Sequence, residues 1–149
     1  MNLGPFLILI VIIIAGGATA MQAPTNARLA VAMGSPVNAA FVSFAVGTVA
    51  LGILAAALHV RPDVAAAKAL PAWAWIGGLY GCVFVITAAW AVPRYGAALT
   101  ITLMVAGQLL VGLALDHFGA LGVPRHPMGI ARLAGVALVF IGVLVVRRF

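Results

Sequence analysis

The sequence predicts an all-α integral membrane protein with five transmembrane helices. Hydrophobic residues make up 66% of the 149 residues and charged residues only 7%, and the mean hydropathy is +1.27. This composition excludes an ordinary water-soluble surface. The apolar residues also gather in five segments, each long enough or nearly long enough to cross about 30 Å of hydrocarbon as a helix. We therefore expect one five-helix transmembrane domain over residues 1–149.

The five expected spans follow one another closely along the chain: 3–29, 37–58, 73–92, 96–115 and 129–146. The first contains Ala18-Thr19-Ala20, which resembles a signal-peptide cleavage site. No basic stretch precedes this run, which is also longer than a signal peptide's apolar core, so we expect a span there. An odd number of crossings places the two termini on opposite faces of the membrane.

Turn-forming residues mark the connections. Gly34-Ser35-Pro36 predicts a tight turn with Pro36 at the start of the second span, and Pro93 is expected in the short link between the third and fourth spans. Tryptophans lie near both ends of the third span, at Trp73 and Trp90. Such rings are typical of the membrane interface, where aromatic belts form.

The basic residues divide equally between the two faces of the membrane. If each segment crosses once, four lie on one side (Arg28, Arg94, Arg147 and Arg148) and four on the other (Arg61, Lys68, Arg125 and Arg132). Lys and Arg in short loops normally decide which face stays in the cytoplasm. An equal count gives no such bias, so the sequence predicts dual topology.

Several function classes are disfavoured. The net charge of +6 comes from scattered residues without a basic cluster, which favours headgroup anchoring over nucleic-acid binding. The single Cys82 and three scattered histidines lack metal-ligand spacing, so we expect no metal site and no cofactor. No catalytic constellation or phosphate-binding loop is present in the sequence, which argues against an enzyme.

Polar residues within the spans are candidates for a substrate site, because an unpaired polar group in hydrocarbon is costly. Gln22 and Asn26 project from one face of the first span, and Pro24 between them removes a backbone donor near the carbonyl of Ala20. A broken helix beside two amides is how many transporters build a site. The alternative, equally weighted, is that the kink shapes packing and the amides bond neighbouring helices.

Gln108 is the amide nearest the centre of a span, and we favour a cavity-lining role for it. An interhelical hydrogen bond in a membrane averages only about 0.6 kcal/mol, so stability alone is a weak reason for its presence. Asn38 and Ser43 in the second span are weaker candidates, because Asn38 is near the span's start and a hydroxyl can bond its own helix.

Asp116 and His117 end the fourth span. Asp116 is a candidate for proton coupling, although a carboxylate at a span's edge also serves as a solvated cap or an arginine partner. Gly135 and Gly142 lie seven residues apart in the fifth span, and small residues permit close helix contact. This stripe predicts a dimer contact; packing within the protomer explains the same spacing.

The chain resembles one known family through an ordered series of motifs. The series includes Gln22 with Asn26, Gly34-Ser35-Pro36, Val42-Ser43-Phe44 with Gly47, Trp75 with Gly77-Gly78, Pro93 with Gly96-Ala97-Ala98, Ala106-Gly107-Gln108, Asp116-His117-Phe118-Gly119 and Arg132-Leu133 with Gly135. It is similar to the five-helix YdcZ-like family of the drug/metabolite transporter superfamily. The resemblance implies a bacterial inner-membrane protein, related to half of a ten-helix transporter and occurring as antiparallel homodimers, matched pairs or fused chains.

The leading hypothesis is a secondary transporter of a small organic solute, built as an antiparallel homodimer in the lipid bilayer. Gln22, Asn26 and Gln108 would line its site, with Tyr80 or Trp90 adding aromatic surface. The first span has no acidic residue, unlike that of the related small multidrug resistance proteins, so their cation export is not carried over. The alternatives are a non-transporting subunit that assembles with another membrane protein and, less favoured, a channel.

Overall fold

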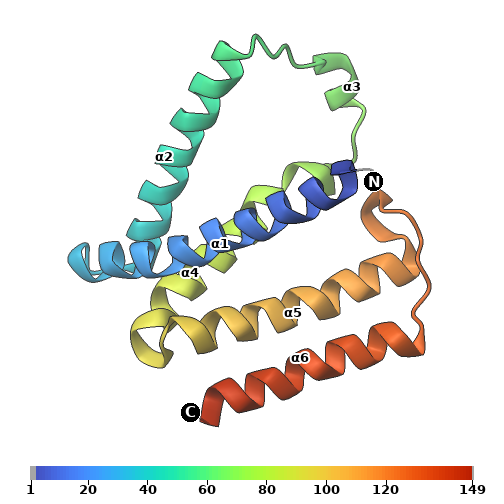
Figure 1. The fold of residues 1–149 in the computed structure, drawn as a ribbon. Helices are drawn as coiled ribbons and strands as arrows, with labels where there is room; N and C mark the ends of the chain where they lie inside the picture. The colour runs from blue at the N-terminus through green and yellow to red at the C-terminus, as the bar shows by residue number, and fades with distance from the viewer. Residues whose placement is uncertain (1–2, 149) are drawn as a thin grey trace. The chain divides into compact units, whose positions relative to one another are not determined.

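The computed structural model describes residues 3–148, in which all the regular elements are helices. In chain order they are α1 (Leu3–Ala32), α2 (Pro36–Ala57), α3 (Val64–Lys68), the 3-10 helix η1 (Ala72–Trp75), α4 (Gly77–Tyr95), α5 (Ala97–Phe118), the 3-10 helix η2 (Ala120–Gly122) and α6 (Ile130–Arg148) (Figure 1). The predicted all-α class is confirmed. The chain forms two compact units, called here unit one, up to Arg94, and unit two, from Tyr95 on.

Within the described residues, four helical segments are long and apolar enough to cross a membrane: Phe6–Ala32, Pro36–Ala57, Ala97–Phe118 and Ile130–Arg148. Helix α4, which lies in the place of the expected third span, is not among the four. It has only 19 residues, beginning with two glycines and ending with Pro93, Arg94 and Tyr95, so it contains no membrane-length stretch as apolar as those of the four segments. A fifth crossing by α4 therefore stays a prediction.

Helix α4 begins and ends a few residues later than the expected third span, 73–92. Residues Ala72–Trp75 form η1, and α4 begins only at Gly77, because the chain leaves η1 through Ile76 in a conformation outside the α-helix. Pro93 lies inside the last turn of α4 instead of in a link. Its fixed φ suits a helix, but its missing N–H leaves the Ala89 carbonyl without its usual donor, and the helix ends two residues later, at Tyr95. The Arg94 guanidinium then donates to the Trp90 carbonyl and lies over the Trp90 ring, 4.5 Å from its centre.

Helix α1 is continuous, so the break expected at Pro24 is absent. A proline inside a helix removes one backbone hydrogen bond, and the turns on either side keep theirs. The neighbouring Thr25 hydroxyl donates to the Met21 carbonyl at 2.9 Å, which adds a bond within the same stretch of helix. The freed backbone groups are thus fewer than an unwound transporter helix would offer.

The turn between α1 and α2 is as predicted. Gly34 has φ +68°, a left-handed conformation that glycine adopts without strain. The Ser35 hydroxyl caps α2 by accepting from the backbone N–H groups of Val37 at 3.2 Å and Asn38 at 3.5 Å. Pro36 is the first residue of α2, where its missing donor costs nothing.

The core of unit one is small and made of alanines. Ala30 of α1, Ala39 of α2 and Ala89 of α4 pack together, with Leu29 against them. Beyond this point α2 leads away from α1 (Figure 1), and its buried residues are confined to its first turns. Large apolar side chains elsewhere on the helices are exposed, as lipid-facing residues of a membrane protein should be.

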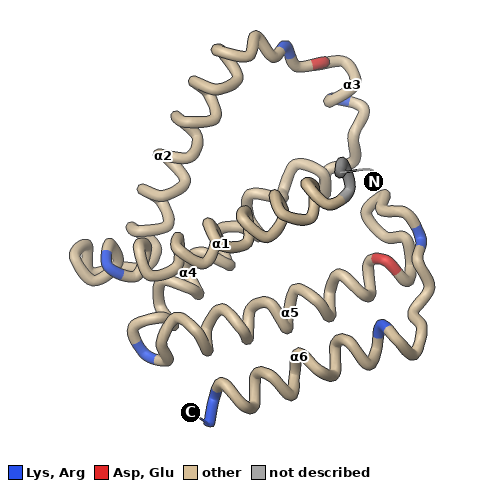
Figure 2. Tube along the Cα trace, viewed as in Figure 1, with Lys and Arg blue, Asp and Glu red and all other residues tan. Residues whose placement is uncertain are grey.

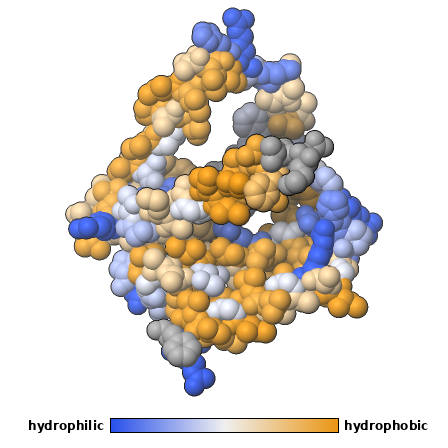
Figure 3. Space-filling view, in the orientation of Figure 1, coloured by the Kyte–Doolittle hydropathy of each residue, from blue (hydrophilic) through white to orange (hydrophobic). Residues whose placement is uncertain are grey.

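The surface divides as a bilayer requires. Charged residues lie near helix ends or in the connections between helices (Figure 2). Hydrophobic residues cover much of the visible helical surface (Figure 3). An apolar exterior of this kind suits hydrocarbon, and the charged ends suit the headgroup regions.

Unit two is a helical hairpin in which α5 and α6 run side by side in opposite directions (Figure 1). Gly119 ends α5 in the left-handed conformation, with φ +63°, and its N–H donates to the Leu115 carbonyl. The connection then passes through η2 and returns to α6 at Ile130. Glycine is needed at this C-terminal cap because a side chain disfavours positive φ.

We expect Gly119→Ala to lower the stability of the folded protein by about 1 kcal/mol or more, from the cost of a left-handed conformation for a residue with a side chain. The added Cβ would also lie 3.3 Å from the Arg125 Cβ. Thermal unfolding in detergent measures the effect. Gly129→Ala, in the same connection, is the control, since its Cβ meets no atom within 4 Å. Equal melting temperatures for the two variants would contradict the prediction.

Candidate functional site

Unit two contains a groove of about 490 Å³ between α5 and α6. Its lining combines three polar side chains with apolar ones: Gln108, Leu109, Gly112, Leu113, Asp116, Arg132, Gly135, Val136 and Val139. The volume is in the range of small-molecule sites. Gln108 is an exposed residue in this groove, as a cavity-lining role requires.

An ion pair lies in the same groove. The Arg132 Nη1 is 3.1 Å from the Asp116 Oδ2, and the two side chains are 42% and 41% exposed. Half-exposed pairs of this kind contribute only about 0–1 kcal/mol to stability. Asp116 therefore has an arginine partner, which was one of the two alternatives to proton coupling, and the pair's position in a groove leaves it open to a ligand.

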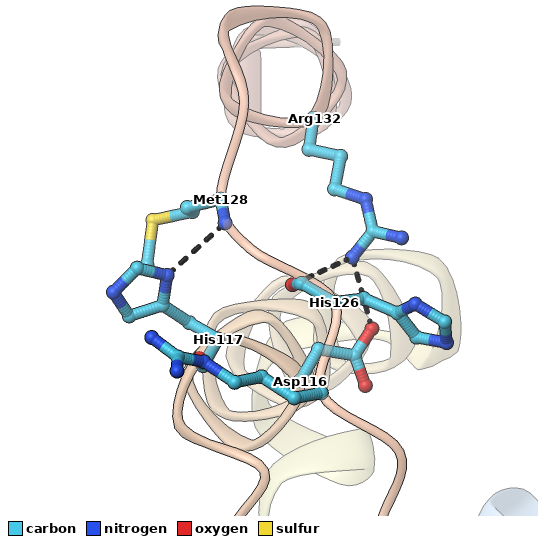
Figure 4. Close-up of polar contacts among 6 residues, drawn as sticks. Asp116, His117, His126, Met128 and Arg132 are labelled. Carbon is cyan, nitrogen blue, oxygen red and sulfur yellow. Dashed lines mark hydrogen bonds and ion pairs between the residues drawn. The ribbon is translucent and has the colours of Figure 1, made fainter.

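The α5–α6 connection folds back onto the end of α5 (Figure 4). The His126 N–H donates to the Asp116 carbonyl at 2.7 Å, and Arg125 Nε donates to the His117 carbonyl at 3.1 Å. The Met128 N–H donates to His117 Nδ1 at 3.0 Å. The first two bonds satisfy carbonyls that the end of a helix leaves without partners. They also hold the connection beside the ion pair, where Arg132 Nη1 reaches the His126 carbonyl at 3.3 Å.

Unit one has a smaller groove between α1 and α2, with a volume of about 230 Å³. It brings together two of the predicted residues, Gln22 and Ser43, with Phe44, Gly47, Thr48 and Leu51. Asn26 does not line it. The Asn26 side chain is only 4% exposed and follows the buried alanines of α1. Gln22 is exposed, so packing against α1 covers only one of the two amides.

The remaining candidates of unit one have different surroundings. Asn38 donates through Nδ2 to the Met33 carbonyl at 3.4 Å, a bond that closes the α1–α2 turn and supports the structural reading. Tyr80 is 60% exposed on α4. Trp90 lines another groove of unit one, of about 440 Å³, together with Pro93 and Arg94.

The two glycines of α6 differ in position. Gly135 lines the groove between α5 and α6, so it faces within the hairpin, whereas Gly142 is outside this groove. A dimer contact through this stripe stays a prediction. Thr100 of α5 is 4% exposed, and its hydroxyl has no hydrogen-bond partner among residues 3–148.

Sequence reasoning missed Arg132 as a site residue, because it entered only the charge count and the family motif. The signal was the combination of a carboxylate at the end of one span and an arginine at the start of the next. A hairpin brings such residues together across a connection, even though they are 16 positions apart.

Comparison with known families identifies the family to which the chain belongs. The family model described as "Putative inner membrane exporter, YdcZ" matches residues 7–145, which include every groove residue named above. The chain belongs to this family. It is a multi-pass protein of the inner membrane, and the family's description supports a transport role, which is not an enzymatic one.

A similar protein is the inner membrane protein YdcZ of Escherichia coli strain K12, which is 38% identical over 76 residues. The alignment covers 51% of this chain and 50% of that relative, so the chain matches about half the relative's length. No solved structure matches the chain. The resemblance found in the sequence motifs is thus confirmed at the level of the family.

Proposed function

We propose that the protein is a secondary transporter of a small organic solute. The observation that carries this proposal is the α5–α6 groove, in which an amide and an open ion pair lie along apolar walls in a member of an exporter family. A structural role alone explains the groove poorly, because a half-exposed pair and an exposed amide stabilise the fold only slightly.

Alternating access would arise from an antiparallel homodimer of chains inserted in opposite orientations. Each protomer then adopts the other's conformation in turn, and the site opens to the opposite face without further machinery. The equal division of basic residues supports this arrangement, which requires five crossings and hence a membrane-spanning α4. In such a dimer Gln108 is proposed to line the solute site, with Gly142 at the contact between protomers.

A reconstituted uptake screen across compound classes identifies the solute, and Gln108→Leu then tests the site. We expect this variant to lose about tenfold in transport, corresponding to one hydrogen bond of about 1.4 kcal/mol to the solute. Its melting temperature should change little, because interhelical hydrogen bonds in membranes are weak.

Thr102→Val on the same helix is the matched control. The Thr102 hydroxyl donates to the Ala98 carbonyl at 2.7 Å and lies outside the groove, so transport should stay within about twofold. A Gln108→Leu protein that transports like the wild type would remove Gln108 from the site. A protein that transports no compound class would instead favour the non-transporting assembly subunit.

A further inference from the structure

Arg132 uses only one of its three guanidinium nitrogens. Nη1 donates to the Asp116 Oδ2 and to the His126 carbonyl (Figure 4). A guanidinium carries five N–H donors, and the Nε–Nη2 edge forms a fork that matches two oxygens of a carboxylate or phosphate. Within residues 3–148 this edge has no hydrogen-bond partner. Arg132 thus keeps a bidentate edge available while its ion pair is intact.

The groove extends from this edge along apolar surface to a second polar group. Gln108 precedes Asp116 by eight residues on α5, a distance of about 12 Å along a helix at 1.5 Å per residue. Between the two ends the walls are apolar: Leu109, Leu113, Val136 and Val139. The groove therefore suits an elongated molecule with one charged end and an apolar body.

The charges around the groove favour an anion at the charged end. Asp116 is the single carboxylate there, and the other carboxylate of the chain, Asp63, belongs to unit one. The positive charges at this end of the groove belong to Arg132 on α6 and Arg125 in the connection, and His117 and His126 lie beside them. With both histidines neutral this end still carries one excess positive charge, which attracts anions and repels cations.

We propose that the α5–α6 groove binds an organic anion, whose carboxylate or phosphate is held by the Nε–Nη2 edge of Arg132. The apolar body lies between the leucines of α5 and the valines of α6, and Gln108 bonds a polar group at the far end. This inference rests on the proposed transport function, because the bound anion would be the transported solute. The same chemistry is also offered by an anionic lipid headgroup, which the experiment distinguishes.

The test uses three probes with one body and different ends: 4-phenylbutyrate, 4-phenylbutanol and 4-phenylbutylammonium. Binding to the full chain is measured by equilibrium dialysis in phosphatidylcholine nanodiscs, with empty discs as background. We expect the carboxylate to bind at least about tenfold more tightly than the other two, as a charge-assisted bidentate contact implies.

Variants locate the contact. Arg132→Gln should abolish the preference for the carboxylate, and Arg132→Lys should keep part of it, because lysine retains the charge without the fork. Arg61→Gln, in the connection between α2 and α3, should bind like the wild type. If Arg132→Gln does not fold, Arg132→Lys alone decides: full wild-type affinity in that variant overturns the bidentate contact. Equal binding of the three probes, or a preference for the ammonium, overturns the proposal.

Discs containing phosphatidylglycerol separate the two sources of the anion. If 4-phenylbutyrate binding, corrected for empty discs of the same lipid, is unchanged, the groove prefers the free solute. If the lipid suppresses probe binding in the wild type, the anion site stands with a lipid as its occupant. Probe binding without transport of any carboxylate would leave this inference in place and overturn the proposed transport function. Transport of cations or alcohols alone would support the proposed transport function and overturn the anion site.

Discussion

A reporter fused after Arg148 is expected on both faces of the membrane in comparable amounts. With five crossings the basic residues divide four against four, so neither orientation is preferred. Adding two lysines beside Arg148 makes the division six against four. At about 1 kcal/mol for each basic residue near an anionic surface, the ratio of orientations should shift by roughly thirtyfold. Paired fusions of alkaline phosphatase and a fluorescent protein measure both populations.

Two controls sharpen this experiment. Two glutamines added at the same place should leave the mixture unchanged, and two lysines added between Arg61 and Lys68 should shift it in the opposite direction. A wild-type chain with its C-terminus on one face alone would contradict the single-chain homodimer.

Reporter fusions at both ends of the chain decide whether α4 crosses the membrane. If α4 stays on one side, Arg94 joins Arg61 and Lys68, and the basic residues divide three against five. The two termini then lie on the same face, so fusions at both ends separate four crossings from five. A uniform topology with both termini together would remove α4 from the spans and the inverted dimer with it.

Asp116→Asn is expected to abolish solute accumulation driven by a pH gradient while solute binding is kept. Asparagine has nearly the same shape as aspartate, but its amide does not ionise and so cannot take up and release a proton during transport. The variant loses the 3.1 Å pair with Arg132, which leaves the guanidinium more available to an anion. Binding should therefore be unchanged or tighter. Because the pair is half exposed, the cost in stability should stay within about 1 kcal/mol.

Accumulation in liposomes with an imposed pH gradient is the measurement, alongside solute binding to the same preparation. The groups that face Asp116 are Arg132 on α6, His126 and Arg125 in the connection, and the adjacent His117. Asp63→Asn is the matched control: Asp63 caps α3 by accepting from the Ala66 N–H at 2.9 Å, and asparagine caps a helix equally well. If Asp116→Asn still accumulates solute along the pH gradient, Asp116 is structural.

The parts of the fold that the sequence predicted correctly depend on local chemistry. The Gly34-Ser35-Pro36 turn needs a positive φ, a hydroxyl cap and a proline start, and three neighbouring residues supply them. The limits of α4 differ from the expected ones because η1 occupies the expected start, and because the helix continues through Pro93 to a last turn in which Arg94 contacts Trp90. Hydropathy along the chain contains neither effect.

In the candidate site too, the sequence located polar residues within the spans but not the packing around them. Gln108 was assigned to a cavity from its depth in an apolar span, and it lines the groove between α5 and α6. Asn26 was grouped with Gln22 by a four-residue spacing, which gives a shared face but not its burial: Asn26 is buried among alanines and Gln22 is exposed. The partner of Asp116 depends on how the connection after Gly119 folds back, which no local pattern in the sequence specifies.

The hydrogen bonds that close the end of α5 bear on how the chain enters the membrane. A protein that inserts in both orientations must translocate each connection in part of its molecules, and exposed carbonyls and charges oppose that passage. In the α5–α6 connection the carbonyls of Asp116 and His117 have protein donors, and the charge of Arg132 is balanced by Asp116. The hairpin thus presents less uncompensated polarity to hydrocarbon than its sequence suggests, whichever way it enters.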